Sequence, residues 1–111
     1  MVDFEKRGNV DVVTFSVNKI NAHIADEIRD KIVAVFENAN ARVVIDLTGV
    51  EYIDSSGFGC FLSLFKAAKN NYGILKFTNA EPQIMALFET LYLHTVFEIY
   101  SDIDSCIKSF R

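Results

Sequence analysis

Apolar residues follow two different patterns along this chain of 111 residues. Short runs rich in Val, Ile and Phe are typical of β-strands, and they occupy residues 10–17, 42–47, 74–78 and 96–100. Elsewhere the apolar residues recur every three or four positions, which is the period of a helix with one buried face. This second pattern covers residues 21–40, 57 to about 70, 82–91 and 101–110.

Local signals mark the ends of several elements. Gly8-Asn9 is a strong two-residue turn signal, so residues 3–7 are expected to pair with the strand at 10–17 as an N-terminal hairpin. Asn21 can cap the first helix, because its side-chain oxygen can accept a hydrogen bond from a free backbone amide. Pro82 suits the first turn of the third helix.

The order of these elements indicates an α/β fold. Strands that alternate with helices predict right-handed crossovers and a mostly parallel sheet. Residues 42–47 are almost continuously apolar, as expected for a strand that is covered on both faces. Because the hairpin adds an antiparallel edge, we expect a mixed sheet of about five strands with about four helices, in a single domain over residues 1–111.

Composition and charge disfavour several classes of protein. Half of the residues are apolar, so the chain is expected to fold. The formal net charge is −4 and the basic residues are scattered, which argues against nucleic-acid binding. No apolar run approaches the length of a membrane span, and the start MVDFEKRGN is too charged for a signal peptide. We therefore expect a soluble, cytoplasmic protein without a membrane segment.

Cysteine and histidine give no indication of a metal or redox site. Cys60 and Cys106 are far apart in sequence and form no CxxC pair, so two buried thiols are favoured, although a disulfide stays open. His23 and His94 have no second ligand at metal spacing, and each is interpreted as an ordinary residue. We expect neither a metal nor a cofactor.

The segment YIDSSGFGCFL, residues 52–62, connects a strand region to the second helix. Within it, Ser55 or Ser56 is a natural cap for the free amides of the helix, and Asp54 favours the positive end of the helix dipole. One cap requires only one hydroxyl. A spare serine at this end of a helix is expected at the surface beside free amides, where a phosphate is readily accommodated.

The helix after this segment is apolar over a wider arc than one buried face requires. At roughly 100° per residue, one face collects Phe58, Phe61, Leu62 and Phe65. Further apolar residues lie outside that face, namely Cys60, Leu64 and Ala67. The excess is either covered by a neighbouring helix, which is the more common case, or contacts a partner, and a weak homodimer stays open.

Several of these residues together resemble a known family. A strand ending in Asp46-Leu47-x-x-Val50 is followed by Asp54-Ser55-Ser56-Gly57-x-Gly59 and then by an amphipathic helix. A strand that starts after a glycine and a helix that contains proline follow at the expected distances. This arrangement resembles STAS-domain proteins of the anti-sigma factor antagonist type, and the element order of that family covers nearly the whole chain.

The resemblance implies that the protein exchanges partners. Proteins of this type bind an anti-sigma factor that is also a serine kinase with a histidine-kinase-like ATPase fold, and thereby free a sigma factor. The kinase phosphorylates the first serine of the motif, which weakens the complex, and a metal-dependent serine phosphatase resets the cycle. Carried onto this chain, the phosphorylated residue is Ser55. The implied partner-binding residues are Asn21, Asp54, Ser55, Ser56, Gly57 and Phe58.

The sequence departs from the family pattern in two loops. Residues 17–21 lack the Gly and the Asp that are usual before the first helix, which affects the details of partner binding. Residues 89–95, ETLYLHT, replace a turn of the Ser-Gly-Leu type, and a longer third helix with a changed surface is one consequence. Neither departure involves Ser55.

Two other kinds of function fit the sequence less well. A STAS module that is never phosphorylated, acting as a scaffold or beside a transporter, does not need the acceptor serine. An enzyme with a serine nucleophile is disfavoured, because residues 54–59 lack a Gly-x-Ser-x-Gly elbow and the histidines have no triad context. Nucleotide binding is disfavoured too, because no glycine-rich phosphate loop follows a strand. We therefore do not expect an enzyme.

Overall fold

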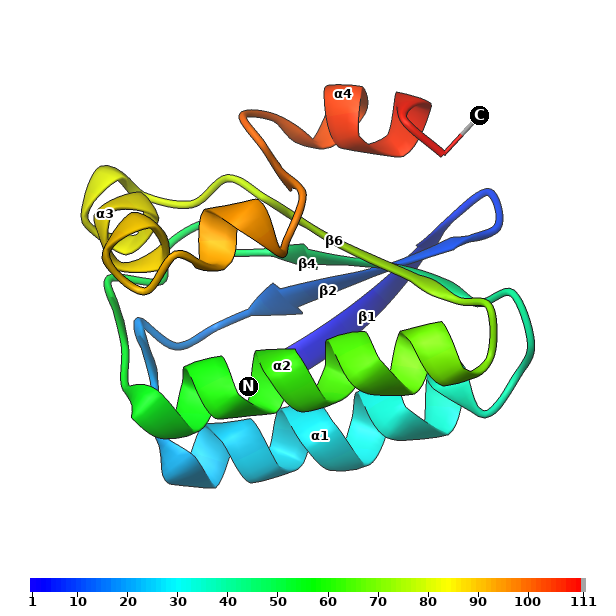
Figure 1. Ribbon diagram of the computed structural model, residues 1–111, viewed down its shortest axis with the longest axis horizontal. Coiled ribbons are helices and arrows are strands. Elements are labelled where there is room, and N and C mark those ends of the chain that lie inside the picture. Colours follow the sequence, from blue (N-terminus) through cyan, green and yellow to red (C-terminus); the bar gives the residue numbers. More distant parts are fainter. Residues whose placement is uncertain (111) are drawn as a thin grey trace.

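A computed structural model describes residues 1–110 and is built around a five-stranded sheet with the order β1-β2-β4-β6-β7 (Figure 1). The strands are β1 Val2–Arg7, β2 Val10–Phe15, β4 Arg42–Asp46, β6 Ile74–Thr78 and β7 Ile99–Tyr100. β1 and β2 form an antiparallel hairpin, and the other neighbours run parallel. The predicted mixed, mostly parallel sheet with an N-terminal hairpin is confirmed.

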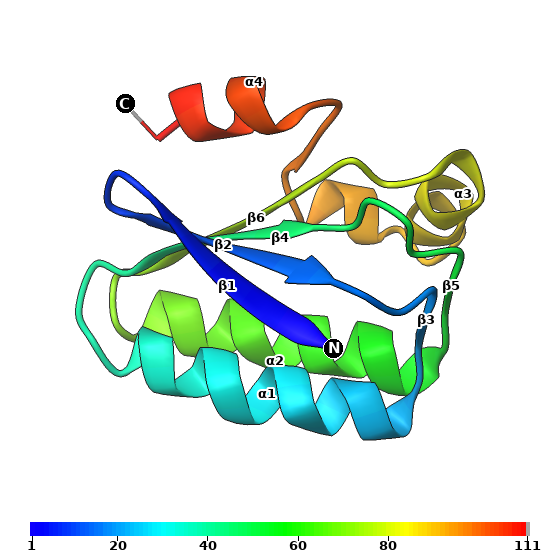
Figure 2. The same cartoon turned by 180° about the vertical axis from the view of Figure 1, so that it is seen from behind.

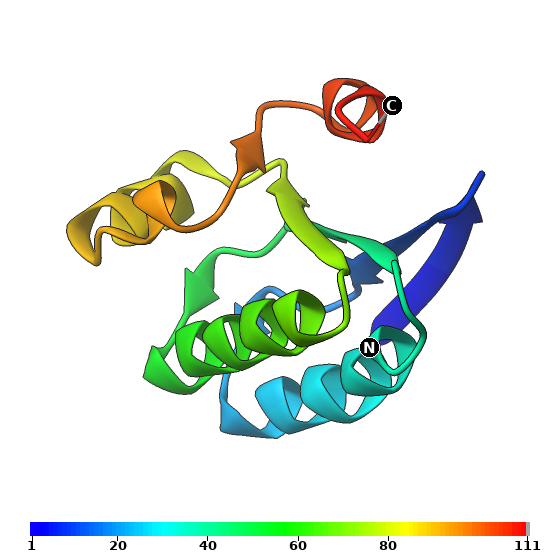
Figure 3. The same cartoon turned by 45° about the vertical axis from the view of Figure 1, so that its right-hand side comes forward.

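Four α-helices surround this sheet, as expected. The first two, α1 Ala22–Phe36 and α2 Ser55–Asn70, lie side by side on one face (Figures 1 and 3). On the opposite face lies α4, Ile103–Lys108, and at one end of the sheet lie α3, Pro82–Thr90, and a short 3₁₀ helix, η1 Leu93–Thr95 (Figure 2). None of the helices within residues 1–110 has the length and apolar character needed to cross a membrane.

The strand predicted at residues 96–100 is shorter than expected. Only Ile99 and Tyr100 pair with β6, because the chain just before them belongs to the η1 turn, where the Phe97 N–H donates to the Leu93 carbonyl at 2.8 Å. The departure at residues 89–95 does not lengthen the third helix. The third helix, α3, ends at Thr90, and Tyr92 has a left-handed backbone with φ of 57°.

A second, two-stranded sheet was not predicted. β3, Lys19–Ile20, pairs in parallel with β5, Tyr52–Ile53. The pairing is extended by the Asp54 N–H, which donates to the Ile20 carbonyl at 3.1 Å. Because β3 leads directly into α1 and β5 leads directly into α2, this small sheet brings the N-termini of the two helices together (Figure 2).

A cluster of phenylalanine rings forms the centre of the core. The Phe77 ring on β6 lies 4.9 Å from Phe61 and 5.6 Å from Phe88, measured between ring centroids. Phe58, in the first turn of α2, extends the cluster with an edge contact to Phe88 at 5.2 Å. Such pairs add about 0.5–1.5 kcal/mol beyond the burial of their area. The core therefore fixes the start of α2 relative to α3 and the sheet.

Most of the excess apolar arc of α2 is covered by α1. Cys60 and Leu64 are fully buried, and the Cys60 thiol donates to the Ala25 carbonyl at 3.4 Å. Cys60 and Cys106 are both free and buried, which confirms the prediction of two buried thiols. Burial raises the pKa of each thiol to about 11, so neither forms the reactive thiolate at neutral pH. Leu62 remains 43% exposed.

Two glycines of α2 provide a matched test of how closely this helix approaches the small sheet. A Cβ atom at Gly57 would lie 2.5 Å from Ile53 Cγ2 and 3.0 Å from Ile20 Cγ2, whereas a Cβ atom at Gly59 would have no neighbour within 4 Å. Gly57→Ala should lower the free energy of unfolding by about 1–3 kcal/mol through overpacking. Gly59→Ala should raise it by about 0.5–1 kcal/mol, because alanine is the better helix former.

Urea denaturation of the two variants and the wild type measures both changes. Equal effects of the two substitutions, or a stabilising Gly57→Ala, would contradict the close contact between α2 and the β3–β5 sheet.

Candidate functional site

The segment Asp54-Ser55-Ser56-Gly57 forms the N-terminus of α2. Asp54 is the N-cap residue, with an extended backbone, and its Oδ1 accepts a hydrogen bond from the Gly57 N–H at 3.1 Å. Ser55 and Ser56 already belong to the helix. The prediction that one of the serines caps the helix is therefore wrong, because the carboxylate one residue earlier reaches the third helical amide.

Both serine side chains are exposed. Within residues 1–110, neither hydroxyl takes part in a hydrogen bond, because the capping role belongs to Asp54. Ser55 sits at the first position of the helix, where the backbone amides have no intrahelical partner and the helix dipole is positive. The geometry thus provides an accessible hydroxyl at an end of a helix that favours negative charge.

Asn21 lies at the equivalent position of the neighbouring helix. Its Oδ1 accepts from the Ile24 N–H at 3.1 Å, which confirms that Asn21 caps α1. The β3–β5 pairing places Asn21 and Asp54 directly after two paired residues, Ile20 and Ile53. The structure thereby brings together two residues that are far apart in sequence, at two capped helix ends on the same side of the molecule (Figures 1 and 2).

The remaining two residues of the predicted site have mainly structural positions. Gly57 is buried where α2 contacts the β3–β5 sheet, and Phe58 is only 6% exposed because its ring joins the phenylalanine cluster. Neither residue presents much surface in this conformation. The accessible part of the predicted site therefore consists of Asn21, Asp54, Ser55 and Ser56, and Gly57 and Phe58 hold it in place.

An apolar groove beside Ser55 was not predicted as a site. Its volume is about 330 Å³, and it is lined by Ser55, Phe58, Gly59, Leu62, Leu91 and Leu93. Leu62 and Leu91 are 43% and 49% exposed. The wide apolar arc of α2 indicated one wall of this groove from the sequence. The other wall comes from the α3–η1 region, whose position beside α2 depends on the tertiary fold.

These features favour recognition by another protein over chemistry within this chain. Ser55 is exposed, and no histidine of residues 1–110 is hydrogen-bonded to its hydroxyl. The described part of the chain also contains no group of three or more His, Cys, Asp or Glu residues that could hold a metal ion. An exposed hydroxyl next to an apolar groove is suited to contact with another protein.

Comparisons with known proteins identify the family and the fold of this chain. The STAS domain family matches residues 1–106. The anti-sigma-B factor antagonist of Bacillus subtilis (strain 168) is 32% identical over 98 residues, which cover 88% of each chain. An anti-sigma factor antagonist from Mycobacterium paratuberculosis has a similar crystal structure, with a TM-score of 0.85 at 22% identity over 98% of this chain and 92% of that chain.

The Bacillus cell fate determinant SpoIIAA, solved in its phosphorylated form, shares the fold over the full length of both chains. Its TM-score is 0.75 at 20% identity, and 100% of each chain is covered. The predicted STAS-like fold is thus confirmed. With a family match over residues 1–106 and a relative at 32% identity, the chain belongs to the STAS-domain family of anti-sigma factor antagonists.

Proposed function

We propose that this protein is an anti-sigma factor antagonist whose partner binding is switched by phosphorylation of Ser55. In its unmodified form it binds an anti-sigma factor that is also a serine kinase with a histidine-kinase-like ATPase fold, and a sigma factor is freed. Phosphorylation by that kinase releases the complex, and a serine phosphatase restores the starting state. The cycle belongs to the cytoplasm, where transcription takes place.

The observation that carries this proposal is the state of the Ser55 hydroxyl. It is exposed, and Asp54 has already taken the capping hydrogen bond of α2. A kinase can therefore reach Ser55, and a phosphate there breaks no hydrogen bond of the described structure. The names of the relatives, anti-sigma factor antagonists, support the class of partner.

The groove distinguishes Ser55 from Ser56. Both serines are exposed, but only Ser55 lines the groove with Leu62 and Leu91. A phosphate on Ser55 would add about −1.5 to −2 charges at the edge of an apolar contact surface. Because Ser56 does not line the groove, a phosphate on Ser56 would place the same charge outside it. Ser55 is therefore the position at which phosphorylation interferes most directly with a partner in the groove.

Two physical effects of this charge favour the free protein. In a complex, a phosphate on Ser55 must lose water next to apolar side chains, and its repulsion from the neighbouring carboxylate of Asp54 is screened less than in water. In the free protein, the same phosphate stays hydrated at the positive end of α2. A combined effect of about 1.4–2.8 kcal/mol would weaken binding roughly 10- to 100-fold.

Substitutions at the two serines test the switch. Wild type, Ser55→Ala and Ser55→Asp serve as baits in a lysate of the native host with added ADP, and captured proteins are identified by mass spectrometry. A histidine-kinase-like ATPase should bind the first two baits and be lost or strongly reduced on the third. The purified kinase should then phosphorylate wild type and the control Ser56→Ala, and leave Ser55→Ala unmodified.

Two outcomes would contradict the proposal. Phosphate incorporation into Ser55→Ala at the wild-type rate would remove Ser55 as the acceptor. Identical partners on all three baits would favour the alternative that this STAS domain is an unphosphorylated scaffold or a module associated with a transporter.

The groove can be tested separately from the acceptor. Leu62→Asp should weaken binding of the purified kinase at least about tenfold, because it places a charge in a contact that must lose water. Tyr72→Asp is the control, since Tyr72 is 82% exposed and follows the other end of α2. Isothermal titration calorimetry measures both affinities. Unchanged binding by Leu62→Asp would exclude the groove from the interface.

A further inference from the structure

The outer edge of β6 is paired along only part of its length. β7 covers Phe77 and Thr78 and no earlier residue of β6. The chain before β7 turns away through η1, whose last turn is closed by the Val96 N–H donating to the Leu93 carbonyl at 3.0 Å. The first half of β6 therefore has a neighbour, β4, on one side only.

The main-chain groups of Leu75 point to this open edge. Alternate residues of a strand direct their N–H and C=O groups to opposite sides in a parallel ladder. Ile74 donates its N–H to the Ala41 carbonyl on the inner side, and Phe77 donates to the Glu98 carbonyl on the outer side. Leu75 is two residues before Phe77 and faces the same outer side.

Within residues 1–110, the N–H and the C=O of Leu75 form no main-chain hydrogen bond with the segment before β7, and β7 does not extend to Leu75. Main-chain groups in folded proteins are nearly always paired, with protein or with water. An unpaired donor and acceptor on one strand residue are the groups that an added extended chain would use.

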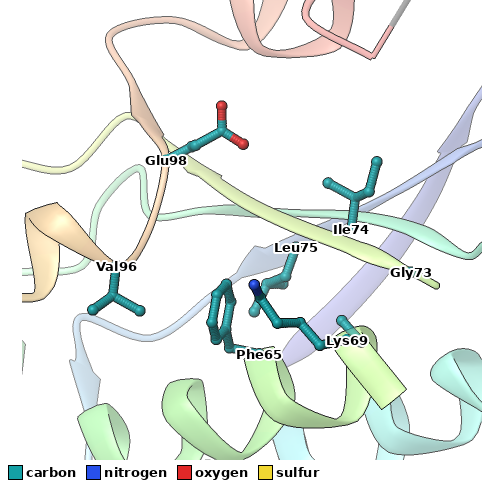
Figure 4. A pocket seen from close by; sticks show the side chains of 8 residues that line it. Phe65, Lys69, Gly73, Ile74, Leu75, Val96 and Glu98 are labelled. Carbon is teal, nitrogen blue, oxygen red and sulfur yellow. The ribbon is translucent and has the colours of Figure 1, made fainter. Parts of the chain in front are cut away.

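A cavity of about 280 Å³ lies at the same place, between α2 and the edge of β6 (Figure 4). Its apolar lining includes Phe65 and Val96, and Leu75 forms part of its wall. The volume is below the roughly 300–1,000 Å³ that is usual for pockets of drug-sized molecules. It therefore suits one or two side chains of a peptide better than a separate small molecule.

The cavity is lined by a positively charged side chain, that of Lys69, which is available to an occupant. Lys69 Nζ lies 5.0 Å from the centroid of the Phe65 ring, and Figure 4 shows it reaching over that ring. Within the described residues Lys69 makes no ion pair. The carboxylate of Glu98, in contrast, lies 3.7 Å from Lys76 Nζ and accepts a hydrogen bond from the Tyr100 hydroxyl at 3.0 Å. An occupant with a carboxylate would complement Lys69.

We propose that this edge of β6 binds an extended, acidic segment of a partner protein by strand addition. The segment hydrogen-bonds to the main chain of Leu75 in continuation of β7, places an apolar side chain on Phe65 and Val96, and pairs a carboxylate with Lys69. A second copy of this chain fits less well. Symmetric pairing of two such edges would bring the Lys69 ammonium of each copy toward that of the other.

The proposed surface is separate from the phosphorylation site. Lys69 is near the C-terminus of α2 and Ser55 is at its N-terminus, so at 1.5 Å per residue they are about 21 Å apart along the helix. Binding at β6 does not depend on the proposed switch, and the failure of one proposal leaves the other standing.

Selection from a displayed library of random heptapeptides tests this surface. Wild-type protein should enrich peptides that alternate apolar residues with Asp or Glu. The strongest of these, as a synthetic peptide, should bind Lys69→Glu at least tenfold more weakly than wild type. Lys66→Glu is the matched control, because Lys66 is exposed on the same helix outside the cavity, and its affinity should stay within twofold. Circular dichroism establishes that both variants fold.

Amide hydrogen exchange, measured by NMR, tests the main-chain contact. The Leu75 amide should exchange faster than those of Ile74 and Phe77 in the free protein, and should become protected when the peptide binds. The proposal is overturned if no peptide is enriched, if the enriched peptides bind Lys69→Glu with unchanged affinity, or if Leu75 is already protected in the free monomer. A dimer found by light scattering, in which the Leu75 amide is protected from exchange, would likewise overturn it in favour of a second copy.

Discussion

The hydrogen bond from the Gly57 N–H to Asp54 Oδ1 determines where α2 begins, and the character of the site follows from it. Because a carboxylate provides the cap, the hydroxyl of Ser55, at the first helical position, has no hydrogen-bond partner within residues 1–110. The cap works together with a close backbone approach, since Gly57 lies against Ile20 and Ile53 of the small β3–β5 sheet. These contacts determine which of the two exposed serines lies beside the groove and which elements surround it.

The phenylalanine cluster of the core holds the N-terminus of α2 in position. Phe58 follows the motif directly and contacts Phe88 of α3, which in turn contacts Phe77 of the central sheet. The site is therefore built on packed aromatic side chains, and the groove beside Ser55 has walls from two elements, α2 and the α3–η1 region. In this account a phosphate changes the charge of a preformed surface and does not need to rearrange the fold.

Regular patterns allowed much of this structure to be predicted from the sequence. The periodic apolar residues gave the four helices, Asn21 was recognised as a cap, and Gly8-Asn9 gave the hairpin. The β3–β5 pairing could not be predicted, because strands of two residues have no periodicity. The capping residue was misassigned because Asp54, Ser55 and Ser56 are all good caps, and tertiary contacts at Gly57 decide among them. The shortened β7 follows from the left-handed turn at Tyr92, which local propensity does not favour.

The most direct test of the central claim compares backbone and aromatic NMR spectra of the unmodified protein and of protein with phosphoserine at position 55. We expect chemical-shift changes at Asn21, at residues 53–59 and around the groove, while the ring resonances of Phe77 and unrelated strands keep their positions. Large shifts across the Phe77 cluster or the central sheet would contradict the account, because they would show that phosphorylation acts by rearranging the core.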